Sequence, residues 1–380
     1  MNVLFVASEL APYAKTGGLA DVMAALPKYL LRAGHDVRIV VPLYDTIDRG
    51  KVALEPVTAF EIPLGSYRYA VEVARERSVY FVSCPELFAR GSLYTTDADE
   101  HRRFLALSYA ALLLCRSIGF QPDIIHAHDW QAALLPMIVK SLFAQSFPSV
   151  RTLLTIHNLN YQGSFPATIV PETNLVPHAH LFHQELLRAR RVNFLLQGIL
   201  YADGVSTVSP TYAQEIQTAE HGAGLDAFLR ARSSTVVGIL NGVDYEEWSP
   251  ERDRLIPYPY SAADATGKQR NKQVLLESLG LPYLERVPVI GIVSRLAGQK
   301  GFGLLDPAMF DMLRQHGFQL VVLGSGEPAL EDMFTRMQRE FPRQVCFYQG
   351  FQNKLAHLIE AGADMFLMPS RYEPCGLNQM

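Results

Sequence analysis

The chain has 380 residues, of which 49% are hydrophobic and 19% are charged, and its formal net charge is -4. This length predicts two or more domains with large cores. The slightly acidic balance, with a pI of about 6.3, argues against a nucleic-acid-binding or membrane-surface protein.

Cysteine usage and the N-terminus predict the compartment. The four cysteines are widely spaced, without a Cys-x-x-Cys motif: Cys84, Cys115, Cys346 and Cys375. This spacing favours free thiols in a reducing compartment over a disulfide framework or a zinc site. The first residues lack a basic region, and Glu9 interrupts their apolar run, which argues against a signal peptide. The longest apolar stretch, residues 104–115, is too short to span a bilayer, so we expect a buried helix there and a soluble cytoplasmic protein.

Short β-rich apolar runs alternate with amphipathic segments along the first part of the chain. We expect a helix over residues 21–34. The apolar runs are continuous rather than alternating, which predicts a parallel sheet covered on both faces. The predicted strands are residues 2–8, 36–42, 123–128, 152–157, 204–209 and 234–240.

Residues 242–285 break this rhythm, because they are rich in Pro, Tyr and charge. We interpret them as a linker and the entry to a second domain. The alternation then resumes, with helices predicted up to about residue 316, over 328–340 and near 353–361. The predicted strands of the second domain are residues 287–295, 318–326, 344–351 and 364–370.

The pattern predicts a division into residues 1–245, 246–285 and 286–380. Another helix is predicted after Gly376, yet the chain stops at Met380. Doubly wound nucleotide domains usually have five or six strands, more than this second domain supplies. We therefore expect the second domain to be incomplete and the natural protein to continue.

Polar residues follow most of the predicted strands in both domains. Ligands of open α/β sheets bind beyond the carboxyl ends of the strands, so this repeated placement predicts a cleft between the domains. The residues concerned are Glu9, residues 15–21, 126–130 and 157–158, Asn241, Arg295, Lys300 and residues 370–376.

The sequence KTGGLADV at residues 15–22 follows the first predicted strand. Gly17 and Gly18 let a ligand approach the backbone, and the next helix offers N–H groups and a positive dipole end. With the charge of Lys15 this favours a phosphate site. A plain tight turn with Asp21 capping the helix is equally weighted. The stretch is not GxGxxG, and the chain contains no P-loop motif, which argues against dinucleotide and P-loop chemistry.

The sequence HAHDW contains three residues of metal-ligand type, His126, His128 and Asp129. Alternation along a strand directs both histidines to one face. No third histidine at helical spacing accompanies them, and Asp129 suits the cap of the next helix. We therefore predict no metal site.

Two motifs place charge after strands of the second domain. Arg295 and Lys300, in SRLAGQKG, form either a metal-free diphosphate site or a solvated basic loop. Glu373, in PSRYEPCG, either binds sugar hydroxyls and stabilises positive charge or simply pairs with Arg371. The GSG at residues 324–326 is not G-x-S-x-G, so no serine hydrolase is predicted.

These stretches together resemble one family, the bacterial glycogen synthases with the plant starch synthases as relatives. The resemblance covers the whole chain, and its motifs occur in the order of the family. They are KTGGLADV, PDIIHAHDWQAAL, IHNLNYQG, STVSPTYAQEI, GILNGVD, GKQRNK, SRLAGQKG and AGADMFLMPSRYEPCGLNQM.

The resemblance implies an α/β fold of the B-type glycosyltransferases, with two Rossmann-like domains that face a cleft. Residues 1–245 would form the starch synthase catalytic domain on the acceptor side, and 286–380 part of the domain on the nucleotide-sugar side. The implied enzyme is a retaining glucosyltransferase that needs no cofactor or metal. Its donor would be ADP-glucose, and its acceptor the non-reducing end of glycogen or another α-1,4-glucan.

The resemblance also assigns roles to residues. Those implied in catalysis lie near the transferred glucosyl unit or the diphosphate: Asp21, His157, Arg295, Lys300 and Glu373. Those implied in substrate binding are Lys15, Gly17 and Gly18 in the first turn, Tyr94 at the glucan, Asn241 at the donor, Phe351 against adenine, and Cys375, Gly376 and Leu377 near the phosphates.

The chain departs from the family pattern at Arg190, Arg191, Gln197 and Glu360, so the resemblance is a weaker guide to helix packing and acceptor contacts there than to the donor site. Family members also continue through a second Gly-Gly turn and a terminal helix. We therefore expect the full-length protein to be active and these 380 residues alone to be weakly active or inactive. Two alternatives stay open: a B-type transferase that uses UDP-glucose, and a non-catalytic glucan-binding protein on the same fold.

Overall fold

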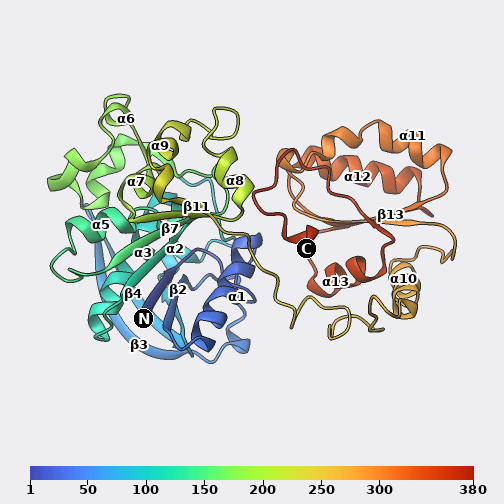
Figure 1. Ribbon diagram of the computed structural model, residues 1–380, viewed down its shortest axis with the longest axis horizontal. Coiled ribbons are helices and arrows are strands. Elements are labelled where there is room, and N and C mark those ends of the chain that lie inside the picture. The colour runs from blue at the N-terminus through green and yellow to red at the C-terminus, as the bar shows by residue number, and fades with distance from the viewer. The chain divides into compact units, whose positions relative to one another are not determined.

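The computed structural model describes residues 1–380, which form two compact units (Figure 1). Unit 1 comprises Met1–Gly242 together with Pro374–Met380, and unit 2 comprises Val243–Glu373. We keep the domains expected from the sequence, residues 1–245 and 286–380 with 246–285 between them, as a proposal.

Unit 1 is built on a nine-stranded sheet. Its strands lie in the order β11 (Val236–Gly238), β10 (Gly204–Thr207), β7 (Arg151–Ile156), β6 (Ile124–His128), β1 (Asn2–Val6), β2 (Asp36–Pro42), β5 (Val79–Ser83), β4 (Tyr67–Glu76) and β3 (Glu55–Leu64). The strands from β11 to β5 are parallel. A separate antiparallel pair joins β8 (Ser164–Pro166) to β9 (Arg191–Asn193).

Helices cover both faces of this sheet, with α1 on one side and α3 on the other (Figure 1). Leu4, Phe5 and Val6 of β1 are fully buried, as expected for a central parallel strand. The helices of unit 1 are α1 (Gly18–Arg32), α2 (Pro85–Phe88), α3 (Glu100–Ser117), α4 (Asp129–Ala132), α5 (Leu135–Ser141), α6 (Gln184–Arg188), α7 (Phe194–Tyr201), α8 (Pro210–Glu215) and α9 (Asp226–Ala231).

Unit 2 has a four-stranded parallel sheet. Its strands lie in the order β14 (Val345–Gln349), β13 (Gln319–Gly324), β12 (Val289–Val293) and β15 (Met365–Phe366). Figure 1 shows α11 (Ala308–Gln315) and α12 (Pro328–Glu340) on one face and α10 (Thr266–Ser278) and α13 (Asn353–Gly362) on the other.

The alternation of β13 divides the core of unit 2 into two layers. Leu320 and Val322 face the layer of α11 and α12, whereas Val321 and Leu323 face that of α10 and α13. Because side chains alternate between the faces of a strand, a continuous apolar run fills both layers. The α/β architecture predicted from such runs is confirmed.

Two expectations were wrong in detail. The first sheet is not wholly parallel, because β4 pairs antiparallel with both β3 and β5. The helix expected after Gly376 is a single 3₁₀ turn, Leu377–Gln379.

Candidate functional site

The carboxylate of Glu9 organises the glycine turn after β1. Glu9 is only 4% exposed, and its oxygens accept hydrogen bonds from Thr16 N at 2.7 Å, Thr16 Oγ1 at 2.6 Å and Gly17 N at 3.1 Å. A buried carboxylate needs such donors to offset its desolvation. The turn that begins α1 is therefore fixed by Glu9, which the sequence placed after the first strand without assigning it a role.

Lys15 and Asp21 are brought together, as Lys15 Nζ lies 2.6 Å from Asp21 Oδ1. Asp21 does not cap α1, because Gly17 is the N-cap residue and the helix has no side-chain cap. A Cβ built on Gly17 would meet no atom within 4 Å. The turn thus presents an open backbone next to a cation and a helix N-terminus.

Tyr94 reaches the same carboxylate from the loop between α2 and α3. Its hydroxyl donates to Glu9 Oε1 at 2.7 Å and lies 2.8 Å from Ser8 Oγ. Burial, reinforced by the charge of Glu9, raises the pKa of Tyr94 well above its usual range. Tyr94 is therefore a neutral donor that is tied to the glycine turn through Glu9.

The ends of β6 and β7 hold a cluster of three histidines. His126 Nε2 lies 2.6 Å from Thr155 Oγ1, and His128 Nδ1 lies 2.9 Å from Nε2 of the predicted catalytic residue His157. Burial lowers the pKa of His126 and of His157 to about 3 and that of His128 well below its usual range. The three rings are neutral at pH 7 and act as hydrogen-bonding groups.

Asp129 fixes the backbone that carries His157. Its Oδ1 accepts from His157 N at 2.7 Å and from Asn158 N at 3.4 Å, and burial raises the pKa of this carboxyl to about 7. The residue has φ +53, a strained conformation for a non-glycine residue that is enriched at functional sites. The HAHDW motif drew attention to Asp129 only as a metal ligand or a cap, and this anchoring of His157 was not predicted.

The last residues of the chain pack within unit 1. Ser209 Oγ donates to Pro374 O at 2.7 Å and accepts from Tyr212 N at 3.0 Å. Cys375 packs against the core of unit 1. A Cβ on Gly18 would lie 3.0 Å from Leu377 Cδ1, so the turn that contains Gly376 and Leu377 approaches the N-terminus of α1.

In unit 2, Glu373 is held by two donors. Lys300 Nζ lies 2.5 Å from Glu373 Oε1, and Ser370 Oγ donates to the same oxygen at 2.6 Å. The pair with Arg371, which was the plain alternative from the sequence, is not formed. Instead Arg371 N donates to Gln299 O at 2.9 Å and ties the Glu373 loop to the loop after β12.

A glycine permits this close approach of the two loops. Gly301 has φ +72, and a Cβ there would lie 1.9 Å from Pro369 O. A side chain at this position would therefore push the loop of Lys300 away from that of Glu373. Gly301 was not among the predicted site residues, although it ends the SRLAGQKG motif.

The side chains of three other predicted site residues take no part in the hydrogen-bonded clusters described above. In unit 2, Arg295 is exposed, and the ring of Phe351 is 62% exposed after β14. In unit 1, Asn241 is half-buried, and its N–H donates to Val208 O at 3.3 Å. An exposed guanidinium and an exposed ring are free to meet a ligand.

Residues 1–380 lack both a cluster of metal-ligating side chains and a helix suited to cross a membrane. They contain no group of three or more His, Cys, Asp or Glu residues placed to hold a metal ion. None of the helices is both long enough and apolar enough to cross a membrane.

Comparison with known proteins matches both parts of the chain. A family model described as the starch synthase catalytic domain matches residues 2–231, and one described as glycosyl transferases group 1 matches residues 281–380. Glycogen synthase from Anaeromyxobacter sp. (strain Fw109-5) is 45% identical, over 100% of this chain and 81% of the relative. Glycogen synthase from Koribacter versatilis (strain Ellin345) is 44% identical, over 100% of this chain and 80% of the relative.

Solved structures agree with these matches. The catalytic domain of Starch Synthase IV from Arabidopsis thaliana, bound to ADP and acarbose, has a TM-score of 0.91 and 37% identity, over 99% of this chain and 80% of that one. Sucrose-phosphate synthase from Thermosynechococcus elongatus shares the fold at a TM-score of 0.59 and 17% identity, over 99% of this chain and 77% of that one. The predicted fold class, with two Rossmann-like domains as in B-type glycosyltransferases, is confirmed.

Proposed function

The chain belongs to the family of glycogen and starch synthases, and from this premise we propose that it transfers glucose from ADP-glucose to the non-reducing end of an α-1,4-glucan. Enzymes of this family are glycosyltransferases, and the solved starch synthase relative was bound to ADP and acarbose. These two ligands support a nucleotide-sugar donor and a glucan acceptor for this chain as well.

The Lys300–Glu373 contact is the observation that carries the proposal. Breaking a glycosyl–phosphate bond builds negative charge on the departing diphosphate and positive charge on the sugar ring. A fixed cation stabilises the first, and a nearby carboxylate stabilises the second. We propose that Lys300, together with the exposed Arg295, holds the diphosphate, and that Glu373 lies beside the glucosyl unit.

We propose matching roles for the residues of unit 1. The open backbone at Gly17 and the charge of Lys15 suit an anionic or hydroxyl-bearing ligand at the N-terminus of α1. Tyr94 and Asp21 would contact the sugars, and neutral His157, held by His128 and Asp129, would hydrogen-bond to the glucosyl unit. Asn241, Cys375, Gly376 and Leu377 would also contact the donor, and Phe351 of unit 2 would stack on its adenine.

The four free thiols fit a reducing compartment. We therefore also propose that the protein works in the cytoplasm, where it would meet both substrates.

Transfer by the full-length protein is tested by following radiolabelled glucose from ADP-glucose into glycogen. The matched variants are Glu373→Gln and Glu340→Gln, since Glu340 pairs with Arg314 elsewhere in unit 2. We expect Glu373→Gln to lower incorporation about 100-fold or more and Glu340→Gln to leave it unchanged.

A parallel assay with UDP-glucose identifies the donor. Faster incorporation from UDP-glucose would overturn ADP-glucose as the donor. Glycogen binding by the full-length protein without incorporation from either donor would overturn transfer and favour a non-catalytic glucan-binding protein. Equal rates for Glu373→Gln and the unsubstituted chain would remove Glu373 from the mechanism.

A further inference from the structure

The loop that carries Tyr94 is anchored on both sides by one buried ion pair. Arg103 and Glu100, in the first turns of α3, lie 2.8 Å apart (Nη1 to Oε2). Arg103 Nη2 donates to Ser92 O at 3.5 Å, before Tyr94. Glu100 accepts from Thr95 N at 3.1 Å and Thr95 Oγ1 at 2.6 Å, directly after Tyr94.

This pair is deeply buried, with Arg103 0% and Glu100 6% exposed. Burying two charges costs desolvation free energy that their attraction roughly cancels, so such a pair is weak evidence for stability. Arg103 Nε also donates to Leu87 O at 2.7 Å, in α2. The pair thereby joins α2, the loop and α3, and its effect is to fix one loop conformation.

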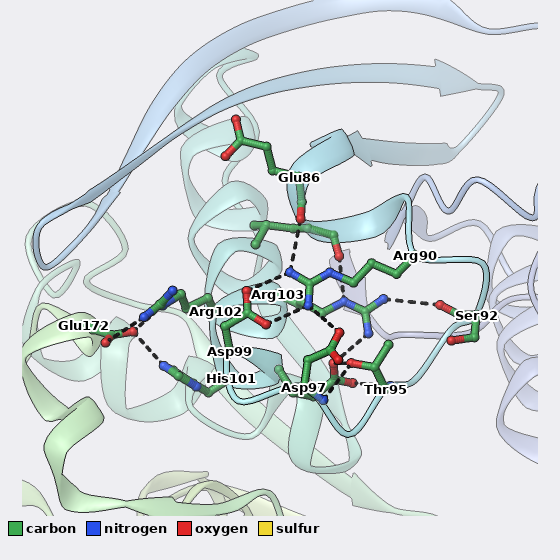
Figure 2. Close-up of polar contacts among 12 residues, drawn as sticks. Glu86, Arg90, Ser92, Thr95, Asp97, Asp99, His101, Arg102, Arg103 and Glu172 are labelled. Carbon is green, nitrogen blue, oxygen red and sulfur yellow. Dashed lines mark hydrogen bonds and ion pairs between the residues drawn. The ribbon is translucent and has the colours of Figure 1, made fainter.

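A second arginine closes the same loop. Arg90 contacts Asp97 at 2.9 Å and Asp99 at 2.7 Å, and Figure 2 shows Arg90, Arg103, Ser92 and Thr95 gathered in one group. Hydrogen bonds from Arg90 lower the pKa of Asp99, so this contact persists over the neutral range. The backbone on either side of Tyr94 therefore has little freedom.

Tyr94 passes this constraint on to the glycine turn. Its hydroxyl donates to Glu9 Oε1, and Glu9 in turn accepts from Thr16 and Gly17. We propose that Arg103 and Glu100 are positioning residues that hold the glycine turn in its ligand-binding geometry through Thr95, Tyr94 and Glu9. The link to glucan binding rests on the function proposed above, whereas the link to the turn does not.

The same helix offers a matched control. Arg102, next to Arg103, pairs with Glu172 at 2.5 Å (Nε to Oε2), and His101 Nε2 lies 2.7 Å from the same oxygen. Figure 2 shows this group apart from the one around Arg103. Its hydrogen bonds and ion pairs join α3 to Glu172 and do not include the residues on either side of Tyr94.

Hydrogen exchange of the backbone amides of Thr16 and Gly17, measured by mass spectrometry on the full chain, tests the proposal without any substrate. The variants are Arg103→Met/Glu100→Leu, Tyr94→Phe, their combination, and the control Arg102→Met/Glu172→Leu. Thr95→Val, which removes one hydrogen bond to Glu100 and leaves the ion pair in place, serves if the double variant fails to fold.

We expect exchange in the turn to accelerate about tenfold in Arg103→Met/Glu100→Leu and in Tyr94→Phe, because residues of one network couple by this order. The combination should add nothing further, and the control should leave the turn unchanged. An unchanged turn in Arg103→Met/Glu100→Leu, equal acceleration in the control, or additive effects in the combination would each overturn the proposal.

Titration calorimetry with maltoheptaose separates this inference from the proposed function. We expect affinity to fall about tenfold in the variants whose turn exchanges faster. Faster exchange with unchanged affinity would uphold the positioning role and overturn the placement of the glucan at Tyr94.

Discussion

The two units place polar side chains after the ends of parallel strands, but they hold these side chains differently. In unit 1, Glu9, His126 and His128 are buried. Glu9 accepts a hydrogen bond from Tyr94, and His128 is hydrogen-bonded to His157. Among the predicted site residues of unit 2, Arg295 and Phe351 are exposed, whereas Lys300 and Glu373 form a close pair. At the carboxyl edge of the sheet in unit 1, the polar side chains are therefore held in place by hydrogen bonds within the unit. At the corresponding edge in unit 2, a charged and an aromatic side chain are exposed and can contact a ligand.

The difference matters for how substitutions should act. Replacing a side chain that is buried and hydrogen-bonded within its own unit lowers the free energy of unfolding even without ligand. Replacing an exposed side chain that contacts only a ligand lowers binding and transfer and leaves the free energy of unfolding nearly unchanged. The predictions below separate these two behaviours, beginning with the largest expected effect.

Lys300→Met should lower glucosyl transfer about 100- to 1,000-fold, the usual loss when one donor to developing negative charge is removed. The substitution also leaves Glu373, whose side chain is 14% exposed, without its cation. Incorporation of labelled glucose from ADP-glucose into glycogen measures the effect. Arg314→Met, which breaks a surface pair with Glu340 in the same unit, is the control, and a loss below about threefold in Lys300→Met would contradict the prediction.

His126→Gln tests the buried edge of unit 1 through acid sensitivity. The pKa of His126 is lowered to about 3 in the folded chain, against about 6.5 when unfolded. Below pH 6.5 the unfolded chain takes up this proton and the folded chain does not, so stability falls as the pH falls from 6.5 towards 3. For this one group, the free energy of unfolding should fall by about 2 kcal/mol between neutral pH and pH 5. The variant, which lacks the imidazole, should not show this part of the fall.

Urea unfolding at pH 7.5 and pH 5 measures this difference. The chain contains two tryptophans, Trp130 in unit 1 and Trp248 in unit 2, so a Trp248→Phe background makes fluorescence report on unit 1 alone. An equal loss of stability on acidification with and without His126 would show that its ring is not held neutral.

Phe351→Ala tests the exposed edge of unit 2. Stacking of a base on an aromatic ring contributes about 1–3 kcal/mol, so the Kd for ADP should rise about tenfold or more. The free energy of unfolding should change by less than about 0.5 kcal/mol, since the ring packs against little. Tyr348→Ala, which removes a ring that is 40% exposed on β14, should leave ADP binding unchanged, and calorimetry would contradict the prediction if both variants lost affinity equally.

The sequence predicted the parallel strands and the loops after them because each leaves a local signal. Continuous apolar runs such as NVLFV in β1 require burial on both faces. The hairpin of β3 and β4 also left a signal that was overlooked: Tyr69, Val71 and Val73 alternate with exposed residues after the turn at Gly65. This period of two marks a half-buried antiparallel strand.

Site residues were predictable from the sequence only where a side chain of suitable chemistry lies directly after a predicted strand. Lys300 and Glu373 lie in motifs that follow strands, and the structure brings them into contact. Glu9, by contrast, receives its hydrogen bond from Tyr94, 85 residues away, and no local pattern reveals such a partner. Asp129 was visible as a charged residue, but its hold on His157 depends on the pairing of β6 with β7, which is a tertiary fact.

Asp21→Asn gives the smallest expected effect and the closest comparison between the two edges. Lys15–Asp21 and Lys300–Glu373 are both lysine–carboxylate pairs, at 2.6 and 2.5 Å, but the first is more exposed, with side chains 27% and 29% accessible against 19% and 14%. An exposed pair contributes about 1 kcal/mol or less to stability, and a carboxylate in the first turn of α1 adds a similar small dipole term. We therefore expect Asp21→Asn to lower the free energy of unfolding of unit 1 by less than about 1 kcal/mol at low salt, and by almost nothing in 1 M NaCl, where such charges are screened. A larger loss of unfolding free energy that persists in 1 M NaCl would mean that the ion pair with Asp21, and not Glu9, holds the turn that carries Lys15. The proposed contrast between the two units would then be wrong for this turn.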